Sequence, residues 1–401
     1  MRPSTAPVTA APTASPATPV MAAAAASAAT AVATWAPLSG SSRAPASMFD
    51  VALMDLDGVV NRGERAVPHA AAVIEAAAVD GLRTVYVTNN ALRTPETVAA
   101  RLTGFGVPAG PTDVVTSAQA AAHVLAERLP AGAKVLVAGG AGLWEAVRAE
   151  GLSPTSSAAD EPAAVVQGFD PEMTYARLVE AVLAVRAGAW WVASNTDLTV
   201  PTERGLAPGN GALVAFVRAA TEAEPVVTGK PELAMHAESV RRSGARNPII
   251  VGDRLDTDIE AGTRSATPTL LVFTGVTGPA ELFAAPPWHR PTFVAADLRG
   301  LRRTQPAVEV RDDSSRCGAW ACVLDGTTLR WHPAADDGAA GRNTNTNTNT
   351  NTNTDSGAGD DGLDALRAAC ALAWAAADAG RTLTALADER PPGCEDLRVP
   401  R

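Results

Sequence analysis

The sequence is short of cysteine, of aromatic residues and of basic charge, and each shortage narrows the class of protein. None of the four cysteines falls within the first 316 residues, and their spacing matches no zinc-binding pattern. They therefore predict free thiols in a reducing cytosol. The net charge of −10 argues against a nucleic-acid-binding protein, which needs a basic face. Aromatic residues are only 4%, but hydrophobic residues reach 46%, so a sizeable core can form. The length of 401 residues predicts two or three domains.

The first 47 residues have almost no charge, since Arg2 and Arg43 are the only charged side chains. Ala, Pro, Thr and Ser dominate, so we expect a disordered tail over residues 1–47. A signal peptide is the alternative for the run from Val20 to Val32, but only one basic residue precedes it. That run lacks Leu, Ile and Phe, so a membrane-spanning helix is not expected.

Apolar strand patterns alternate with helical patterns from residue 50 onward. Such alternation predicts an α/β fold with a parallel sheet covered by helices on both faces. The expected strands are Val51–Asp55, Thr84–Thr88, Lys134–Ala138, Ala164–Phe169, Ala189–Ser194, Ile249–Gly252 and Thr269–Phe273. The expected helices are His69–Val79, Pro95–Leu102, Ala118–Arg128, Leu143–Glu150, Glu172–Arg186, Gly211–Thr221 and Glu232–Arg242.

The C-terminal hundred residues have a different pattern. Residues 343–354 are six Asn-Thr repeats between Gly- and Asp-rich stretches, which predicts a solvated linker. Ala319–Leu324 and Thr328–Trp331 read as a hairpin before the linker, and Leu363–Ala379 reads as an apolar helix after it. We therefore expect a small α+β unit that spans the linker.

Two carboxylates follow the most apolar of the expected strands. Val51 to Met54 lead directly into Asp55 and Asp57, and Gly58 comes next. A strand that is apolar on both faces is a buried parallel strand, and open α/β sheets bind their ligands at the carboxyl ends of such strands. Buried carboxylates are costly unless a cation or hydrogen-bond donors compensate. A Mg²⁺ site with an aspartate nucleophile is one natural explanation.

Phosphoryl chemistry explains this pair. A carboxylate at Asp55 is a competent nucleophile for phosphorus. A second carboxylate at Asp57 is placed to protonate a leaving alkoxide and later to activate water. At the end of the next strand, the hydroxyl of Thr88 and the turn at Asn89 and Asn90 are candidates to hold phosphate oxygens.

Two later motifs complete the set. Lys230, between Gly229 and Pro231, is a candidate to neutralise charge on the nucleophile and on the transferring phosphoryl group. Asp253 ends another apolar strand, and with Asp55 and the backbone carbonyl of Asp57 it would complete an oxygen-rich Mg²⁺ site. Each motif alone is weak, but four in order at strand ends are a specific pattern.

With these motifs the chain resembles the haloacid dehalogenase (HAD) superfamily, subfamily IIA, the NagD-like or p-nitrophenyl phosphatase group. The resemblance covers residues 48–295 and implies a HAD-type Rossmann-like core. It implies that Asp55 is the nucleophile and Asp57 the general acid/base, and that Mg²⁺ is the cofactor. Thr88 matches the second motif and Lys230 the third. Asp253 with Asp258 matches the fourth, which implies that Asp258 contacts the metal's ligands or a metal-bound water.

The same resemblance implies a cap domain of the C2 type inserted between the second and third motifs. The segment from Ser194 to Asp197 resembles the family's return from cap to core, so Asn195 and Asp197 are candidate site residues; a polar turn is the alternative. The expected domains are a tail over 1–47, a core over 48–116 and 201–295, a cap over 117–200, and a C-terminal domain over 296–401.

Small phosphomonoesters are the expected substrates. The extra C-terminal domain resembles that of actinobacterial glycerol-3-phosphate phosphatases, which favours glycerol 3-phosphate. The alternatives are 2-phosphoglycolate, nucleoside monophosphates and pyridoxal 5′-phosphate. An aspartate-phosphoacceptor domain, a haloacid dehalogenase and a non-catalytic binding protein are the alternatives from other classes. We expect a cytoplasmic enzyme without nucleic-acid or membrane partners, and the resemblance leaves open a homodimer formed through the cap.

Overall fold

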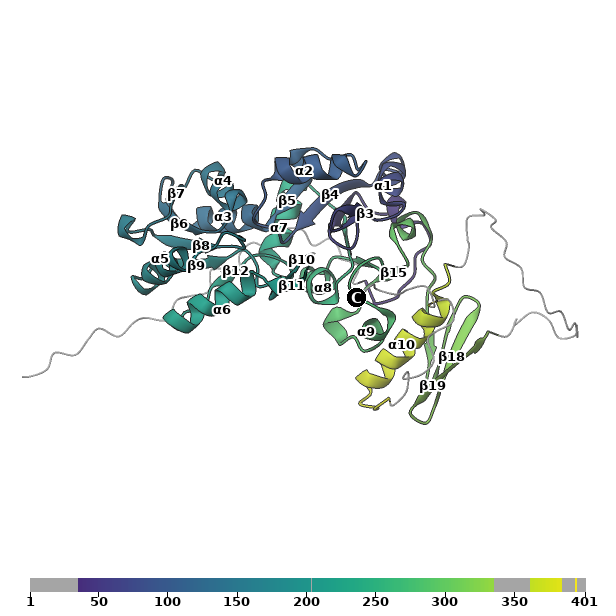
Figure 1. Cartoon of the computed structure of the whole chain (residues 1–401). Helices are drawn as coiled ribbons and strands as arrows, with labels where there is room; N and C mark the ends of the chain where they lie inside the picture. The colour runs from purple at the N-terminus through teal and green to yellow at the C-terminus, as the bar shows by residue number, and fades with distance from the viewer. Residues whose placement is uncertain (1–34, 203, 335–360, 384–393, 395–401) are drawn as a thin grey trace, which may run out of the picture. The chain divides into compact units, whose positions relative to one another are not determined.

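The computed structural model describes residues 35–202, 204–334, 361–383 and 394 (Figure 1). Most of the expected tail, residues 1–34, and the Asn-Thr repeats at 343–354 lie outside these ranges. In the described part of the chain, no helix combines the length and the apolar character needed to cross a membrane.

The first sheet is parallel throughout and has the strand order β15-β14-β13-β1-β4-β5. Its central strand β1 is fully buried because both of its faces are apolar. Ala52 and Met54 pack toward helices α1 and α2, whereas Val51 and Leu53 pack toward α7 and α8. The strands are β1 (Val51–Met54), β4 (Arg83–Thr88), β5 (Val114–Thr116), β13 (Pro248–Gly252), β14 (Thr269–Val272) and β15 (Phe293–Ala295). The helices are α1 (Ala70–Val79), α2 (Pro95–Gly104), α7 (Leu233–Ser243), α8 (Glu260–Ser265) and α9 (Pro279–Phe283).

A second parallel sheet, of order β12-β9-β8-β6-β7, is inserted in the chain after β5. Helices α3 and α4 pack on one of its faces, and α5 and α6 on the other. Its strands are β6 (Lys134–Ala138), β7 (Ser153–Thr155), β8 (Ala164–Gln167), β9 (Trp190–Ala193) and β12 (Val226–Val227). Its helices are α3 (Ser117–Arg128), α4 (Ala141–Ala149), α5 (Tyr175–Arg186) and α6 (Asn210–Thr221).

The inserted sheet continues past the boundary expected at residue 200. Val226 and Val227 pair with Val192 and Ala193 of β9, and α6 packs against α5. A two-residue strand has no recognisable pattern, so pairing over this sequence distance was not visible in the sequence. Two short hairpins were missed for the same reason: β2 (Asn61–Arg62) with β3 (Arg65–Ala66), and β10 (Thr199–Thr202) with β11 (Gly205–Pro208).

The C-terminal part forms an antiparallel sheet covered on one face by a helix, as expected for a small α+β unit. The strands are β16 (Glu309–Arg311), β17 (Ser314–Cys317), β18 (Trp320–Asp325) and β19 (Thr328–Pro333), and the helix is α10 (Asp364–Asp378). Leu324, Leu329 and Leu372 are among the buried residues between them. Arg367 of α10 is 2% exposed and donates from Nη2 to the carbonyl oxygen of Val294 in β15, at 2.7 Å.

Candidate active site

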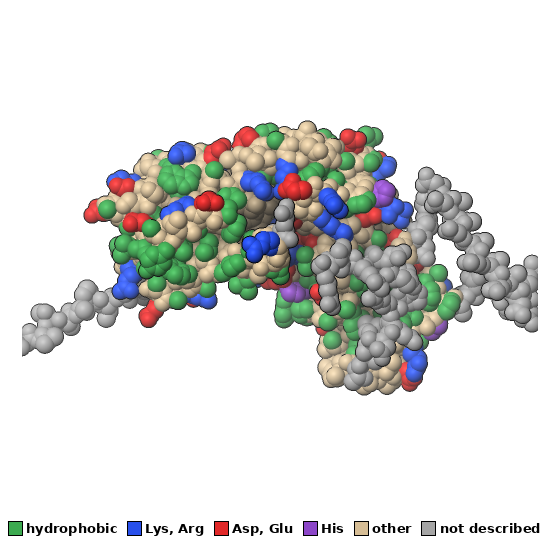
Figure 2. Space-filling model, in the orientation of Figure 1, with side chains coloured by type: hydrophobic (Ala, Val, Ile, Leu, Met, Phe, Trp, Pro, Cys, Tyr) green, Lys and Arg blue, Asp and Glu red, His purple; other side chains and the backbone are tan. Residues whose placement is uncertain are grey.

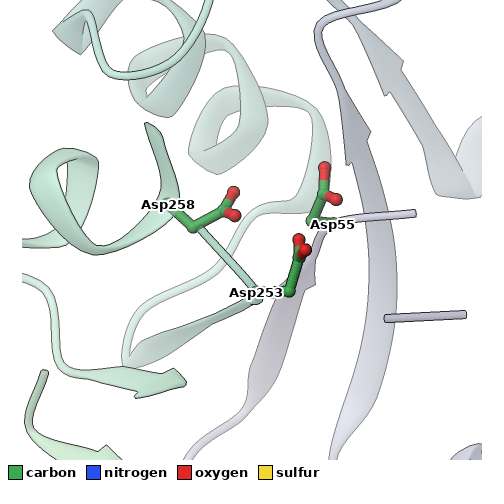
Figure 3. Close-up of side chains that lie close together, drawn as sticks. All are labelled: Asp55, Asp253 and Asp258. Atoms are coloured by element: carbon green, nitrogen blue, oxygen red, sulfur yellow. The ribbon is translucent and has the colours of Figure 1, made fainter. Parts of the chain in front are cut away.

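Three carboxylates converge at the carboxyl edge of the first sheet (Figure 3). Asp55 follows β1, Asp253 follows its neighbour β13, and Asp258 lies in a π-helical turn over Leu255–Ile259. One oxygen from each lies within 4.8 Å of the others. Asp253 and Asp258 are buried, whereas the Asp55 side chain keeps 13% of its surface exposed. The structure therefore brings together Asp55, Asp253 and Asp258, the three carboxylates that the sequence analysis placed around the metal site.

Lys230 supplies the positive charge of this group. Its Nζ donates to Asp55 Oδ1, to Asp258 Oδ1 at 2.7 Å and to the carbonyl oxygen of Val87 at 3.1 Å. These acceptors satisfy all three donors of the buried ammonium group. Lys230 therefore lies between the proposed nucleophile and the carboxylate behind it.

Burial and mutual repulsion set the electrostatics of the carboxylates. Burial raises the pKa of Asp55 well above its ordinary value, against the opposing effect of Lys230. Burial also raises the pKa of Asp253 to about 7, and the charge of Asp258 adds to that rise. Burial by itself lowers the pKa of Lys230, but Asp258 and Asp55 outweigh it and hold the pKa above the ordinary value. Three ionised carboxylates would therefore carry more negative charge than one lysine can balance.

The donor set fits a divalent cation. Asp253 Oδ2 accepts a hydrogen bond from the backbone N–H of Val276 at 2.6 Å, but its Oδ1 is buried without a partner among the described residues. An unsatisfied buried carboxylate oxygen is costly, and hard oxygen ligands are those that Mg²⁺ prefers. Gly58 and Gly275 leave room there, because a Cβ at either would lie 2.4 Å or 1.8 Å from Asp253 Oδ2.

Asp57 lies apart from the three carboxylates. Its side chain is exposed, and Asn61 Nδ2 donates to its Oδ1 at 2.8 Å. Asp57 lines a small hollow together with Thr88, Asn90 and Arg93. A carboxylate that faces a hollow and keeps its access to water is suited to proton transfer.

The turn after β4 is organised by its own side chains. Thr88 Oγ1 accepts from the backbone N–H of Asn90 at 3.1 Å. Asn90 Oδ1 accepts from the N–H groups of Leu92 and Arg93 at 3.0 and 3.1 Å. Two of the polar groups expected to hold phosphate therefore also build the turn, and their contact with phosphate stays a prediction.

Asn89 has a contact that sequence reasoning missed. Its Oδ1 accepts from the backbone N–H of Lys230 at 2.7 Å, and its Nδ2 donates to the Lys230 carbonyl oxygen at 3.1 Å. The Asn89 side chain therefore holds the Lys230 backbone through both its N–H and its carbonyl group, while contact of this turn with phosphate stays a prediction. Nothing in the sequence pairs positions 89 and 230, so no pattern signals this contact.

Asn195 and Asp197, the site residues expected after β9, both lie against Asn89. Asn195 Nδ2 donates to the Asn89 carbonyl oxygen at 2.7 Å, and Asp197 accepts from Asn89 Nδ2 at 3.3 and 3.4 Å. Burial raises the pKa of Asp197, while Arg254 opposes that rise. The structure therefore places both residues beside the site, one bond removed from Lys230.

Comparison with known proteins agrees with this geometry. The model of the haloacid dehalogenase-like hydrolase family matches residues 52–153, and a HAD-hydrolase-like model matches residues 227–301. The D-glycerol 3-phosphate phosphatase of Mycobacterium tuberculosis is 46% identical over 265 residues, which are 66% of this chain and 74% of that protein. The chain belongs to the haloacid dehalogenase-like hydrolases.

A second curated protein and a solved structure are also similar to this chain. The 5′-nucleotidase YutF of Bacillus subtilis is 37% identical over 227 residues, 56% of this chain and 87% of that protein. A crystal structure of the M. tuberculosis glycerol phosphate phosphatase in complex with magnesium is 38% identical, with a TM-score of 0.69. That likeness covers 83% of this chain and 92% of the other. The chain is therefore an enzyme of the phosphatase type, with the expected parallel-sheet core.

Proposed function

We propose that this haloacid dehalogenase-like hydrolase is a Mg²⁺-dependent phosphatase that hydrolyses a small phosphomonoester through an aspartyl-phosphate. The observation that carries the proposal is Lys230, whose ammonium group bonds to both Asp55 and Asp258 beside the unsatisfied oxygen of Asp253. A lysine and a carboxylate-bound cation together offset the charge that repels a phosphate from a carboxylate nucleophile.

The first half of the reaction transfers the phosphoryl group. A carboxylate oxygen of Asp55 attacks phosphorus, the bond from phosphorus to the ester oxygen breaks, and Asp57 gives that oxygen its proton. The product alcohol leaves, Asp55 carries the phosphoryl group, and Asp57 is ionised. Asn61 orients Asp57 for this transfer through its 2.8 Å hydrogen bond.

The second half returns the enzyme to its starting state. Asp57 takes a proton from a water molecule, which attacks the phosphorus of the aspartyl-phosphate and releases inorganic phosphate and the Asp55 carboxylate. Thr88 and Lys230 hold the phosphoryl oxygens in both halves, with the turn at Asn89 and Asn90. Bound Mg²⁺, held by Asp55, Asp253 and the backbone carbonyl of Asp57, would supply charge screening for these residues. Asp258 keeps Lys230 in place behind them.

Glycerol 3-phosphate is the substrate we propose. Its support is the likeness to the M. tuberculosis D-glycerol 3-phosphate phosphatase, which includes the structure covering 83% of this chain. The likeness to a 5′-nucleotidase makes nucleoside monophosphates the main alternative. 2-Phosphoglycolate and pyridoxal 5′-phosphate belong in the same substrate panel.

We also propose that the inserted parallel sheet is the cap of this enzyme and that the protein is cytoplasmic. The proposed cap extends from α3 to β12, because the helices and strands of this segment pack in the two apolar cores on either face of the second sheet. Basic and acidic side chains are interspersed on the face seen in Figure 2, which supports the absence of a nucleic-acid partner. A homodimer through the cap is part of this proposal and is tested by sedimentation.

Phosphate release from this panel, with Mg²⁺ and with EDTA, tests the function. We expect Mg²⁺-dependent release, with kcat/KM highest for glycerol 3-phosphate, and a loss of at least about 10³-fold in Asp55→Asn. Asp50→Asn is the matched control, because Asp50 caps backbone N–H groups of Arg246 and Asn247 away from the site. Mg²⁺-independent release, or release that survives in Asp55→Asn, would contradict the mechanism.

A further inference from the structure

The carboxyl edge of the second sheet is occupied by a segment of the chain itself. Open α/β sheets hold their ligands at this edge. Here the loop after β4 fills it: the N–H of Gly142, in the first turn of α4, donates to the Leu92 carbonyl oxygen at 2.9 Å. A Cβ at Gly142 would lie 2.5 Å from the carbonyl oxygen of Arg93, so only glycine admits this approach. The second sheet therefore holds the loop that carries Asn89.

Three asparagines connect this edge to Lys230. Asn210, at the start of α6, donates from Nδ2 to the carbonyl oxygen of Asn195 at 2.7 Å. Asn195 donates in the same way to the carbonyl oxygen of Asn89 at 2.7 Å. Asn89 then holds the backbone of Lys230 through both of its amide atoms. Four segments far apart in the sequence are thus joined by consecutive side-chain-to-backbone hydrogen bonds.

Burial protects the hydrogen bonds that Asn210 and Asn195 donate. Asn210 is 1% exposed and Asn195 is 4% exposed, so water does not compete for their amides. Asn210 Oδ1 has no hydrogen-bond partner in the described part of the chain. Asn210 does not cap its own helix either, because the N-cap position is Gly209 and makes no side-chain cap bond. Its amide is therefore buried at a cost, and its one bond is the donation to Asn195.

We propose that Asn210 is a positioning residue for Lys230, acting through Asn195 and Asn89. This inference rests on the proposed role of Lys230 in holding the phosphoryl group. Asn210 touches none of the reacting groups. Its hydrogen bond fixes the Asn195 backbone, and the Asn195 side chain in turn fixes the Asn89 carbonyl group. Asn89 then fixes the position of the Lys230 backbone, and that position determines where the Lys230 ammonium group lies relative to Asp55.

A double-mutant cycle in the full chain separates positioning from general stability. In Asn210→Ala we expect kcat for phosphate release to fall about 10-fold with KM changed less than about threefold, as misplaced catalytic groups do. In an Asn89→Ala background the same substitution should have little further effect, because the connection is already broken. Thr221→Ala is the matched control, since it removes a 2.8 Å side-chain-to-backbone bond from the same helix. Effects that multiply in the double variant would overturn the proposal.

Hydrogen exchange at the Lys230 amide gives a readout that needs no activity. We expect exchange about tenfold faster in Asn210→Ala than in Thr221→Ala, equivalent to about 1.4 kcal/mol of lost protection. Asn210→Asp keeps the shape of the side chain but replaces the donor with an acceptor, so it should speed exchange as the alanine variant does. It replaces the alanine variant in this experiment if that variant does not fold. Unchanged exchange in both variants would refute the positioning role. A wild-type protein that releases no phosphate would refute the proposed function alone, because the exchange result stands apart from it.

Discussion

Asn61 Nδ2 donates a hydrogen bond to Asp57 Oδ1 across 2.8 Å, and this contact fixes an otherwise exposed carboxylate. The backbone supports the same pair, because the Gly58 N–H donates to the Asn61 carbonyl oxygen at 2.7 Å. Gly58 has a φ of +96°, a left-handed conformation that glycine adopts without strain. The general acid we propose is therefore held by a tight turn and one amide.

Asp57→Asn should abolish proton transfer and leave the fold intact. An amide can still meet the Asn61 side chain, but it cannot protonate the leaving group, so we expect kcat to fall by about 10²–10⁴-fold. Thermal unfolding should change little, because the side chain is exposed. Steady-state kinetics and a melting curve on the same preparation check both halves. A variant with unchanged kcat would remove Asp57 from the mechanism.

The stability of the metal-free protein should fall as pH rises. Burial raises the pKa of Asp253 to about 7, whereas an unfolded chain has an aspartate pKa of about 3.9. Between these values the folded protein binds a proton that the unfolded chain does not, so the free energy of unfolding decreases with rising pH. Urea unfolding in EDTA from pH 5 to pH 8 should show this decrease in the wild type.

Asp253→Asn and Mg²⁺ should each weaken that dependence, and the raised pKa of Asp55 should maintain the remainder in the variant. The amide does not titrate, so the pH slope of the variant should be shallower than that of the wild type. Mg²⁺ binds the ionised carboxylate, so it should stabilise the wild type more at pH 8 than at pH 5. Equal slopes in the wild type and Asp253→Asn would show that Asp253 titrates normally in the folded protein.

Two glycine-to-alanine substitutions should change the free energy of unfolding in opposite directions. At Gly142 the added Cβ would meet the Arg93 and Ala91 carbonyl oxygens at 2.5 and 2.7 Å, so we expect a loss of about 1–3 kcal/mol of stability and of activity with it. At Gly104, at the end of α2, the Cβ would meet nothing within 4 Å. Gly104→Ala should therefore stabilise by up to about 1 kcal/mol. Chemical denaturation of both variants decides the point, and a neutral Gly142→Ala would contradict the close approach.

Arg367→Ala should strongly destabilise the junction between α10 and β15. The guanidinium group is 2% exposed, bonds to Asp361 and to Asp364 at 3.1 Å, and reaches the Val294 carbonyl oxygen. Removing the cation from buried carboxylates costs about 3–5 kcal/mol. Arg330→Ala removes an exposed pair with Asp325 and should cost less than about 1 kcal/mol. Similar melting temperatures for the two variants would show that the buried pair is dispensable.

The sequence was sufficient for the main elements because each has a strong local pattern. The expected strand over Lys134–Ala138 matches β6, and the other long strands differ only at their ends. Strands as short as β5, β7, β12 and β15 have too few residues for periodicity and form by pairing with neighbours distant in the chain. The haloacid dehalogenase-like core was therefore predictable, whereas the extent of the inserted sheet was not.

The candidate site was predictable where residues follow strands. Asp55 and Asp253 end adjacent parallel strands, so their meeting follows from topology alone. The contacts of Asn89, Asn195 and Asn210 join side chains to backbone groups, which leave no trace in residue types. A sequence does not show which carbonyl group a polar side chain will meet in the folded protein, so these contacts could not be predicted.

Lys230 follows β12, the last strand of the inserted sheet, by only a few residues, so it lies where the chain returns to the first sheet. Without Lys230, the group formed by Asp55, Asp253 and Asp258 would lose the ammonium group that bonds to two of its carboxylates. An edge with the three carboxylates and without this lysine would attract metal ions but repel phosphate esters. The position of this one ammonium group therefore decides whether the edge accepts an anionic ester or only a cation.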